Sequence, residues 1–165
     1  MAKPKCIPSQ DYLQSILQYK EGNLYWKIRP SQGTKIGDIA GSISGGYGQI
    51  YIHNSPYKSH RIIFMMHYGY VSDQIDHIDG NPLNNKIENL RAVTTSQNQL
   101  NRKISPNSKT GYKGVSFHSQ TGRYQVRVSI NGKDKYFGIY EDLELAGLVA
   151  QMAREKYHGE YARHI

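Results

Sequence analysis

The sequence is poor in cysteine, in long apolar runs and, over one long stretch, in acidic residues. Its single cysteine, Cys6, excludes an internal disulfide and a cysteine-rich zinc site. No apolar run is long enough to span a membrane. The first nine residues contain Lys3 and Lys5 but lack the apolar core of a secretory signal. These absences predict a soluble, intracellular protein with no membrane partner.

Acidic residues are missing between Glu88 and Asp134. The basic residues of that stretch are Arg91, Arg102, Lys103, Lys109, Lys113, Arg123, Arg127 and Lys133. A solvated surface normally mixes both signs, so a long one-signed stretch favours contact with phosphates. The net charge of +8 agrees with a nucleic-acid partner, although excess lysine can also aid solubility.

A chain of 165 residues fits one medium domain or two small ones. Apolar spacing predicts a short helix over 11–19, capped by Ser9 or Asp11, and another over 62–68 that stops at Gly69. Strand-forming residues predict a small antiparallel sheet from Asn23–Ile28, Gln49–His53 and Tyr57–Arg61. Trp26 is expected in the core of this part.

The next segment, 75–98, is dense in histidine, aspartate and asparagine. Asp76 and His77 are expected at a strand end, and Asn98 near the start of a helix that begins around Thr95. A hairpin followed by a helix would bring them together. Oxygen atoms of Asp76 and Asn98 suit one hard cation, and a neutral His77 suits proton transfer from water. The alternative is that the Asp-His pair is an ordinary turn or surface pair and that the asparagines 81, 84, 85 and 89 are turn formers.

A basic linker is expected over 101–110, followed by three strands at 112–117, 123–130 and 135–140. Asn131-Gly132 is a strong two-residue hairpin signal. A helix is expected over 142–158, with Asp142 as its N-cap and Gly159 as its stop. In the middle strand Tyr124 starts an apolar face that would pack on this helix, which leaves the arginine-bearing face exposed to solvent.

The segment 59–101 resembles the HNH endonucleases of phage and intron-homing type. The resemblance rests on His60-Arg61 before a short helix, on the run Asp76-His77-Ile78-Asp79-Gly80-Asn81, on Asn89-Leu90, and on Asn98. It implies a ββα-metal (His-Me finger) fold, with His77 as general base, Asp76 and Asn98 as ligands of Mg²⁺ or Mn²⁺, and Asn89 fixing the hairpin loop. His60 and Arg61 are auxiliary candidates, and a packed structural histidine is an equal alternative for His60. The chain departs from many relatives at Asn84-Asn85-Lys86, where they carry Asp-Asn-Arg.

The segment 112–162 resembles the DNA-binding domain of plant ethylene-response factors (the Apetala-type domain). The matching motifs are Tyr112-Lys113-Gly114-Val115, Gly122-Arg123-Tyr124 and Tyr136-Phe137-Gly138-Ile139-Tyr140. The resemblance implies that the sheet enters the major groove. The DNA-binding candidates carried over by position are Lys113, Ser116, His118, Arg127, Ser129 and Tyr136, with Arg123 and Gln125 close by. A solvated sheet face is the alternative.

Together these observations predict an α+β protein in three parts. Residues 1–100 form an HNH nuclease domain with an N-terminal sheet elaboration, 101–110 a basic linker, and 111–165 a three-stranded antiparallel sheet packed on one helix. The predicted function is metal-dependent endonuclease cleavage of double-stranded DNA, in a phage homing role, intron-encoded or free-standing. We expect no small-molecule cofactor, a monomer or transient dimer, and the host cytoplasm as its location. The rivals are a non-catalytic DNA-binding regulator on a nuclease-like scaffold and a restriction or colicin-like nuclease of low specificity.

Overall fold

The computed structural model describes residues 6–162, and the chain divides into two compact units, Met1–Val93 and Thr94–Ile165. Each unit combines helices with small antiparallel sheets, so the α+β class is confirmed. The division falls just before the helix at Thr95, earlier in the chain than the expected linker at 101–110, and the linker stays a prediction. Among the described residues, no helix is long and apolar enough to cross a membrane.

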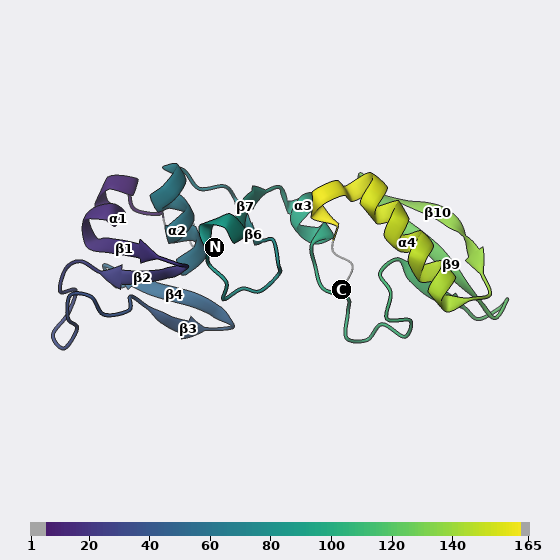
Figure 1. The fold of residues 1–165 in the computed structure, drawn as a ribbon, viewed down its shortest axis with the longest axis horizontal. Helices are drawn as coiled ribbons and strands as arrows, with labels where there is room; N and C mark the ends of the chain where they lie inside the picture. Colours follow the sequence, from purple (N-terminus) through teal and green to yellow (C-terminus); the bar gives the residue numbers. More distant parts are fainter. Residues whose placement is uncertain (1–5, 163–165) are drawn as a thin grey trace. The chain divides into compact units, whose positions relative to one another are not determined.

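The first unit builds three small antiparallel sheets around two helices (Figure 1). Its elements are α1 (Gln10–Ile16), β1 (Leu17–Lys20), β2 (Asn23–Trp26), β3 (Ser42–Ser44), β4 (Tyr47–Ile52), β5 (Ser55–Lys58), α2 (Ser59–Tyr68), β6 (Gln74–His77), the 3₁₀ turn η1 (Ile87–Asn89) and β7 (Leu90–Val93). The sheets pair β1 with β2, β3–β4–β5 in sequence order, and β6 with β7.

The predicted helix over 11–19 is too long. Ser9 caps α1 as expected, because its hydroxyl accepts from the Tyr12 amide, but the helix ends at Ile16. The residues after it form β1, which pairs with β2 across a two-residue turn at Glu21-Gly22. Both turn residues have positive φ, 46° and 87°, which is the backbone that two-residue hairpins require. Leu17 and Tyr19 are therefore in a strand because they pair with β2, although their spacing also fits a helix.

The predicted strand over 57–61 also ends early, because α2 begins at Ser59 rather than at Ile62. Its first turn is buried along with its apolar residues, so Ser59 and His60 belong to the packed face of the helix. The helix stops at Gly69 as predicted, where φ is 73°. Because α2 begins at Ser59, His60 lies in its first turn and is buried in the interior of the unit.

The core of the first unit gathers around α1, α2 and β4. Its fully buried members include Leu13, Ile50, Ile62 and Ile63, and Trp26 is 8% exposed, which confirms its expected core position. Removing this apolar surface from water stabilises the unit. The cluster also contains Ile75 of β6 (Gln74–His77) and Leu90 of β7 (Leu90–Val93), so the β6–β7 hairpin shares its core with α2.

The second unit contains α3 (Thr95–Leu100), β8 (Val115–His118), β9 (Arg123–Ile130), β10 (Lys133–Tyr140), α4 (Leu143–His158) and the 3₁₀ turn η2 (Gly159–Tyr161). The three strands form one antiparallel sheet with β9 in the centre, and α4 lies along it (Figure 1). Val126, Ala146 and Ala150 are fully buried between them. The predicted sheet on one helix is therefore confirmed for this unit.

Local signals explain the ends of these elements. Asp142 caps α4, accepting from the Leu145 amide at 2.6 Å, as predicted. The turn Asn131-Gly132 has φ values of 52° and 76°, as its sequence indicates. The first strand starts at Val115 rather than at Tyr112, because Gly114 holds a left-handed φ of 78° and lies against the Arg127 backbone.

Candidate active site

His77 is the last residue of β6 and is only 6% exposed. Its Nε2 lies 2.9 Å from the side-chain oxygen of Asn85, which comes from the loop between β6 and β7. Its ring also meets the ring of His60 nearly at right angles, with centroids 5.0 Å apart. The imidazole is therefore held on one side by an amide and on another by the first turn of α2.

His60 is packed rather than solvated, with 8% of its surface exposed. Burial, followed by electrostatic interactions with His77, Arg61 and Lys58, lowers the pKa of His60 from 6.5 to about 3. Its buried Nδ1 has no hydrogen-bond partner. At neutral pH His60 is thus an uncharged side chain. The neighbouring Arg61 donates from Nη1 to the backbone carbonyl of Asp73 at 3.1 Å.

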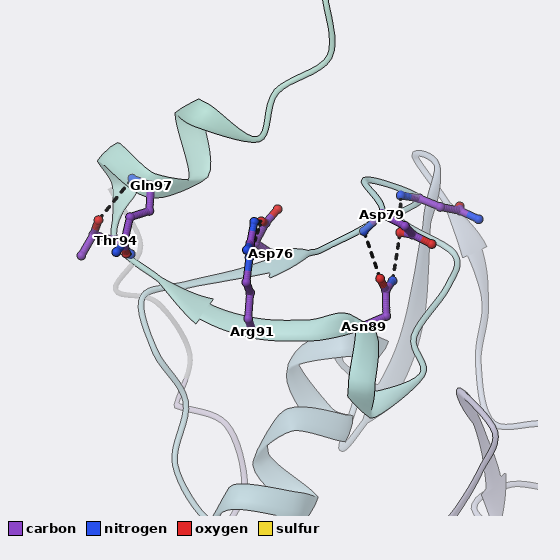
Figure 2. A network of polar contacts seen from close by, with 7 residues as sticks. Asp76, Asp79, Asn89, Arg91, Thr94 and Gln97 are labelled. Atoms are coloured by element: carbon purple, nitrogen blue, oxygen red, sulfur yellow. Dashed lines mark hydrogen bonds and ion pairs between the residues drawn. The ribbon is translucent and has the colours of Figure 1, made fainter. Parts of the chain in front are cut away.

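Asp76 is 8% exposed and pairs with Arg91, which lies directly opposite it on β7. Nε and Nη2 of Arg91 lie 3.1 and 3.0 Å from the same carboxylate oxygen, Oδ2 (Figure 2). Adjacent strand residues point to opposite faces of a sheet. Accordingly Asp76 contacts Arg91, whereas His77 contacts His60 and Asn85.

The loop after His77 is closed by hydrogen bonds between Asp79 and Asn89. The Asn89 amide donates from Nδ2 to Asp79 Oδ1 at 2.9 Å and accepts the Asp79 backbone N–H at 3.0 Å (Figure 2). It also donates to the carbonyl of Asn84 at 2.8 Å, and the Asn84 amide donates to Asp79 Oδ2 at 2.7 Å. One asparagine thus ties the two ends of the loop together.

The electrostatics of Asp79 agree with this arrangement. Partial burial raises the pKa of the Asp79 carboxyl, but hydrogen bonds from the Asn84 side chain, the Asn81 backbone and the Asn89 side chain outweigh it. These bonds, together with the electrostatic interaction with His77, lower the pKa below its ordinary value. The loop is therefore built around an ionised carboxylate.

Asn98 lies on α3, in the second unit, and is half-buried. The helix begins as predicted, with a capping box in which Thr94 and Gln97 bond each other's backbone amides (Figure 2). In residues 6–162, no three His, Cys, Asp or Glu side chains gather as a metal site. The two oxygen donors that the sequence suggests for a hard cation belong to different units, the buried carboxylate of Asp76 to the first and the carboxamide of Asn98 to the second. Their use as ligands of one ion stays a prediction.

The DNA-binding candidates that lie on strands of the second unit share the sheet face opposite α4, whereas Lys113 precedes β8. Strand register sets them in cross-strand pairs, Ser116 with Gln125, His118 with Arg123, Tyr136 with Arg127, and Asp134 with Ser129. Arg127, Ser129 and Tyr136 are exposed, whereas Lys113, His118 and Gln125 are half-buried. The alternating partners Val126 and Val128 are buried beneath them.

Arg123 and His118 have side-chain partners within the unit. Arg123 donates to Glu141 at 2.7 Å in an exposed ion pair. His118 Nδ1 lies 3.0 Å from the hydroxyl of Thr121. An exposed pair of this kind contributes little, so Arg123 can exchange Glu141 for a phosphate at small cost.

Sequence reasoning missed the contacts of Asn85 and Arg91. Both are set by three-dimensional packing, the first by burial of one asparagine among four in the same loop and the second by the register of the hairpin. The weak available signal for Arg91 was its place in a hairpin opposite a predicted strand. Nothing in the sequence marks Asn85 apart from its neighbours.

Comparisons with known proteins agree with this geometry. Residues 57–100 match the family described as HNH endonuclease. Protein 3.8 of Escherichia phage T7 is 36% identical over 89 residues, which cover 54% of this chain and 73% of the T7 protein. Uncharacterized HNH endonuclease L560 of Acanthamoeba polyphaga mimivirus is 34% identical over 88 residues, covering 53% of this chain and 44% of the viral protein. No solved structure matches the chain. The chain belongs to the HNH endonuclease family, a family of phosphodiesterases.

Proposed function

We propose that this protein is a divalent-metal-dependent endonuclease of double-stranded DNA, with His77 as its general base. The observation that supports this most is the state of His77, a buried imidazole whose Nε2 is held by an uncharged amide. A histidine whose Nε2–H is bonded to such an acceptor leaves Nδ1 to take a proton from water. The water then attacks the phosphorus atom of the scissile phosphodiester.

Asp76 and Asn98 are the proposed ligands of the cation, Mg²⁺ or Mn²⁺. When bound, a divalent cation polarises the scissile phosphate and stabilises the leaving oxygen. Arg91 holds the Asp76 carboxylate through Oδ2, so this side chain is fixed by its cross-strand neighbour. Asn98 is carried by a helix whose start is fixed by the Thr94–Gln97 capping box.

Asn89 has a structural part in the same proposal. By joining Asp79 to Asn84, it keeps the loop after His77 in one conformation. The catalytic imidazole therefore sits at the edge of a closed loop rather than at a mobile end. Positioning of this kind is a large part of what an enzyme contributes to rate.

Cleavage of supercoiled plasmid DNA tests the proposed activity. Wild-type protein should cut in Mg²⁺ and stop when the metal is chelated. Asp76→Ala and Asn98→Ala should each lower the rate by roughly 100-fold or more, because a catalytic metal contributes several kcal/mol, and each should weaken Mn²⁺ binding in a titration. Asn107→Ala, which changes an exposed asparagine outside the site, should cut like wild type. Intact plasmid under all conditions would instead support a DNA-binding protein without catalysis.

We further propose that the sheet of the second unit reads the DNA target. Support comes from the exposed face on which Arg127 and Tyr136 pair across strands, with no acidic residue between Glu88 and Asp134. Arginine and glutamine in this face could bond base edges, and lysine the phosphates. A reader tethered to a nuclease raises its local concentration at chosen sites.

Replacing Arg127 by alanine tests the reader. Loss of one phosphate contact should weaken DNA binding and lower the slope of log K against log salt by about 1, whereas loss of a base contact should relax preference at one position. Lys156→Ala removes an exposed positive charge from α4, and should change neither. Equal effects of the two variants would show that the sheet face has no special part in binding.

A homing role in a phage, intron-encoded or free-standing, is our proposal for the biological setting. It rests on the similarity to a phage protein and on the pairing of a nuclease with a reader. Mapping the cut ends on DNA that flanks the gene's own locus tests it. A single cluster of cuts there is expected, and cuts scattered without preference would contradict it.

A further inference from the structure

Asn85 is unlike the other asparagines of the loop between β6 and β7. It is 7% exposed, whereas Asn81 is exposed and Asn84 and Asn89 are half-buried. The others bond Asp79 or the loop backbone, but the Asn85 side-chain oxygen lies 2.9 Å from His77 Nε2. The buried Asn85 amide therefore makes a specific contact with the proposed base, whereas the other asparagines stabilise the turn.

The contact has a chemical consequence for His77. A carboxamide oxygen only accepts hydrogen bonds, so the proton of a neutral imidazole that faces it must sit on Nε2. The basic electron pair of that tautomer is then on Nδ1. Which nitrogen of a histidine stays basic is set in this way by the bond that the other nitrogen makes.

We propose that Asn85 is a positioning residue, which holds the His77 ring in one orientation and in the tautomer that leaves Nδ1 basic. The inference rests on the proposed role of His77 as general base. Asn85 does not itself touch the reacting atoms in this account. It acts through His77, in the same way that a residue bonded to a metal-bound histidine acts on the metal through that histidine.

The surroundings of Asn85 are built to keep it in place. A Cβ atom at Gly22, in the turn between β1 and β2, would lie 3.0 Å from the Lys86 nitrogen and 3.2 Å from the Asn85 carbonyl carbon. A Cβ atom at Gly48, in β4, would lie 2.9 Å from the hydroxyl of Ser59 and 3.4 Å from Asn85 Nδ2. Two glycines thus let backbone from separate hairpins close on this residue, while the Asp79–Asn89 bonds hold the loop from its other end.

Two substitutions of Asn85 distinguish the effect of losing its hydrogen-bond acceptor from the effect of changing its volume. Asn85→Leu keeps nearly the same size and removes the acceptor, and Asn85→Asp keeps the acceptor. In single-turnover cleavage with Mg²⁺, Asn85→Leu should be about 10- to 100-fold slower than wild type, with DNA affinity unchanged within a factor of about two. Asn85→Asp should recover most of the rate. Lys86→Ala, the exposed neighbour, should behave as wild type.

The ¹⁵N signals of His77 give a readout that does not depend on activity. In metal-free wild-type protein, the neutral form of the His77 ring should carry its proton on Nε2 and leave Nδ1 bare. In Asn85→Leu the two tautomers should mix. Unchanged signals in Asn85→Leu, or a wild-type cleavage rate in that variant, would overturn the inference, as would equal loss of rate in Asn85→Leu and Asn85→Asp.

The outcomes distinguish this inference from the proposed function. If wild type cuts DNA and His77→Ala does not, while Asn85→Leu cuts normally, only the role of Asn85 is wrong. If wild type leaves DNA intact with every divalent metal, the nuclease proposal fails and the role of Asn85 fails with it.

Discussion

The clamp between Asp79 and Asn89 gives the sharpest prediction for stability. Replacing Asn89 by alanine removes three side-chain hydrogen bonds, at 3.0, 2.9 and 2.8 Å, and leaves the two backbone bonds of that residue in place. Asp79 keeps its bonds to the Asn81 amide and the Asn84 side chain. The change therefore opens the loop at one defined point.

The expected loss follows from the net value of such bonds. Each contributes about 0.5–1.5 kcal/mol, net of the bonds to water that it replaces. Asn89→Ala should therefore lower the free energy of unfolding of the first unit by about 2 kcal/mol. Asn81→Ala is the matched control, since its side chain accepts a single bond from the Leu83 amide, and it should cost about 1 kcal/mol or less.

Urea unfolding followed by tryptophan fluorescence measures this loss. The chain has one tryptophan, Trp26, and it lies in the core of the first unit, so its signal reports on that unit. A double-mutant cycle with Asp79→Ala should show a coupling of about 1 kcal/mol, because the two side chains bond directly. If Asn89→Ala costs no more than Asn81→Ala, and the cycle shows no coupling, the clamp does not hold the loop.

Two further outcomes are expected. The first unit should lose stability as the pH falls below 6.5, because His60 binds a proton near pH 6.5 when unfolded but only near pH 3 when folded. The slope from this residue approaches about 1.4 kcal/mol per pH unit, so urea unfolding at pH 7 and pH 4.5 should show a smaller loss for His60→Phe than for wild type, and an equal loss would show that His60 is protonated in the folded protein. Asp142→Ala should lower the stability of the second unit by about 1 kcal/mol, because the cap on Leu145 is lost. Circular dichroism should show that loss while the Trp26 transition stays unchanged, and a shift of the Trp26 transition instead would contradict it.

The sequence predicted those elements whose signals are local. Asn131-Gly132 marks a hairpin because both residues tolerate positive φ, and Asp142 marks a helix start because its short carboxylate reaches the first-turn amides. The turn at Glu21-Gly22 was missed because glutamate at a φ of 46° is uncommon, so β1 was assigned to the preceding helix. The local spacing of Leu17 and Tyr19 fits either structure, and pairing with β2 decides between them.

In the candidate site, too, the features with local signals are predicted by the sequence, and those that depend on packing are not. The sequence predicts Asp76 and His77 at a strand end and a helix that begins around Thr95, and the structure confirms both. The ion pair of Asp76 with Arg91 depends on the register of β6 against β7, which depends in turn on how the loop folds. Asn85 is distinguished from its neighbours by burial, and burial comes from segments far away in the chain.

The most direct test of the nuclease account is the cleavage rate of His77→Ala beside its binding affinity for the same DNA. The account predicts an affinity within a factor of about two of wild type, and a rate in Mg²⁺ lower by about 100-fold or more, the usual contribution of a general base. His53→Asn, a change at an exposed turn histidine in the same unit, should leave both unchanged. A His77→Ala protein that cuts at the wild-type rate would contradict the central claim.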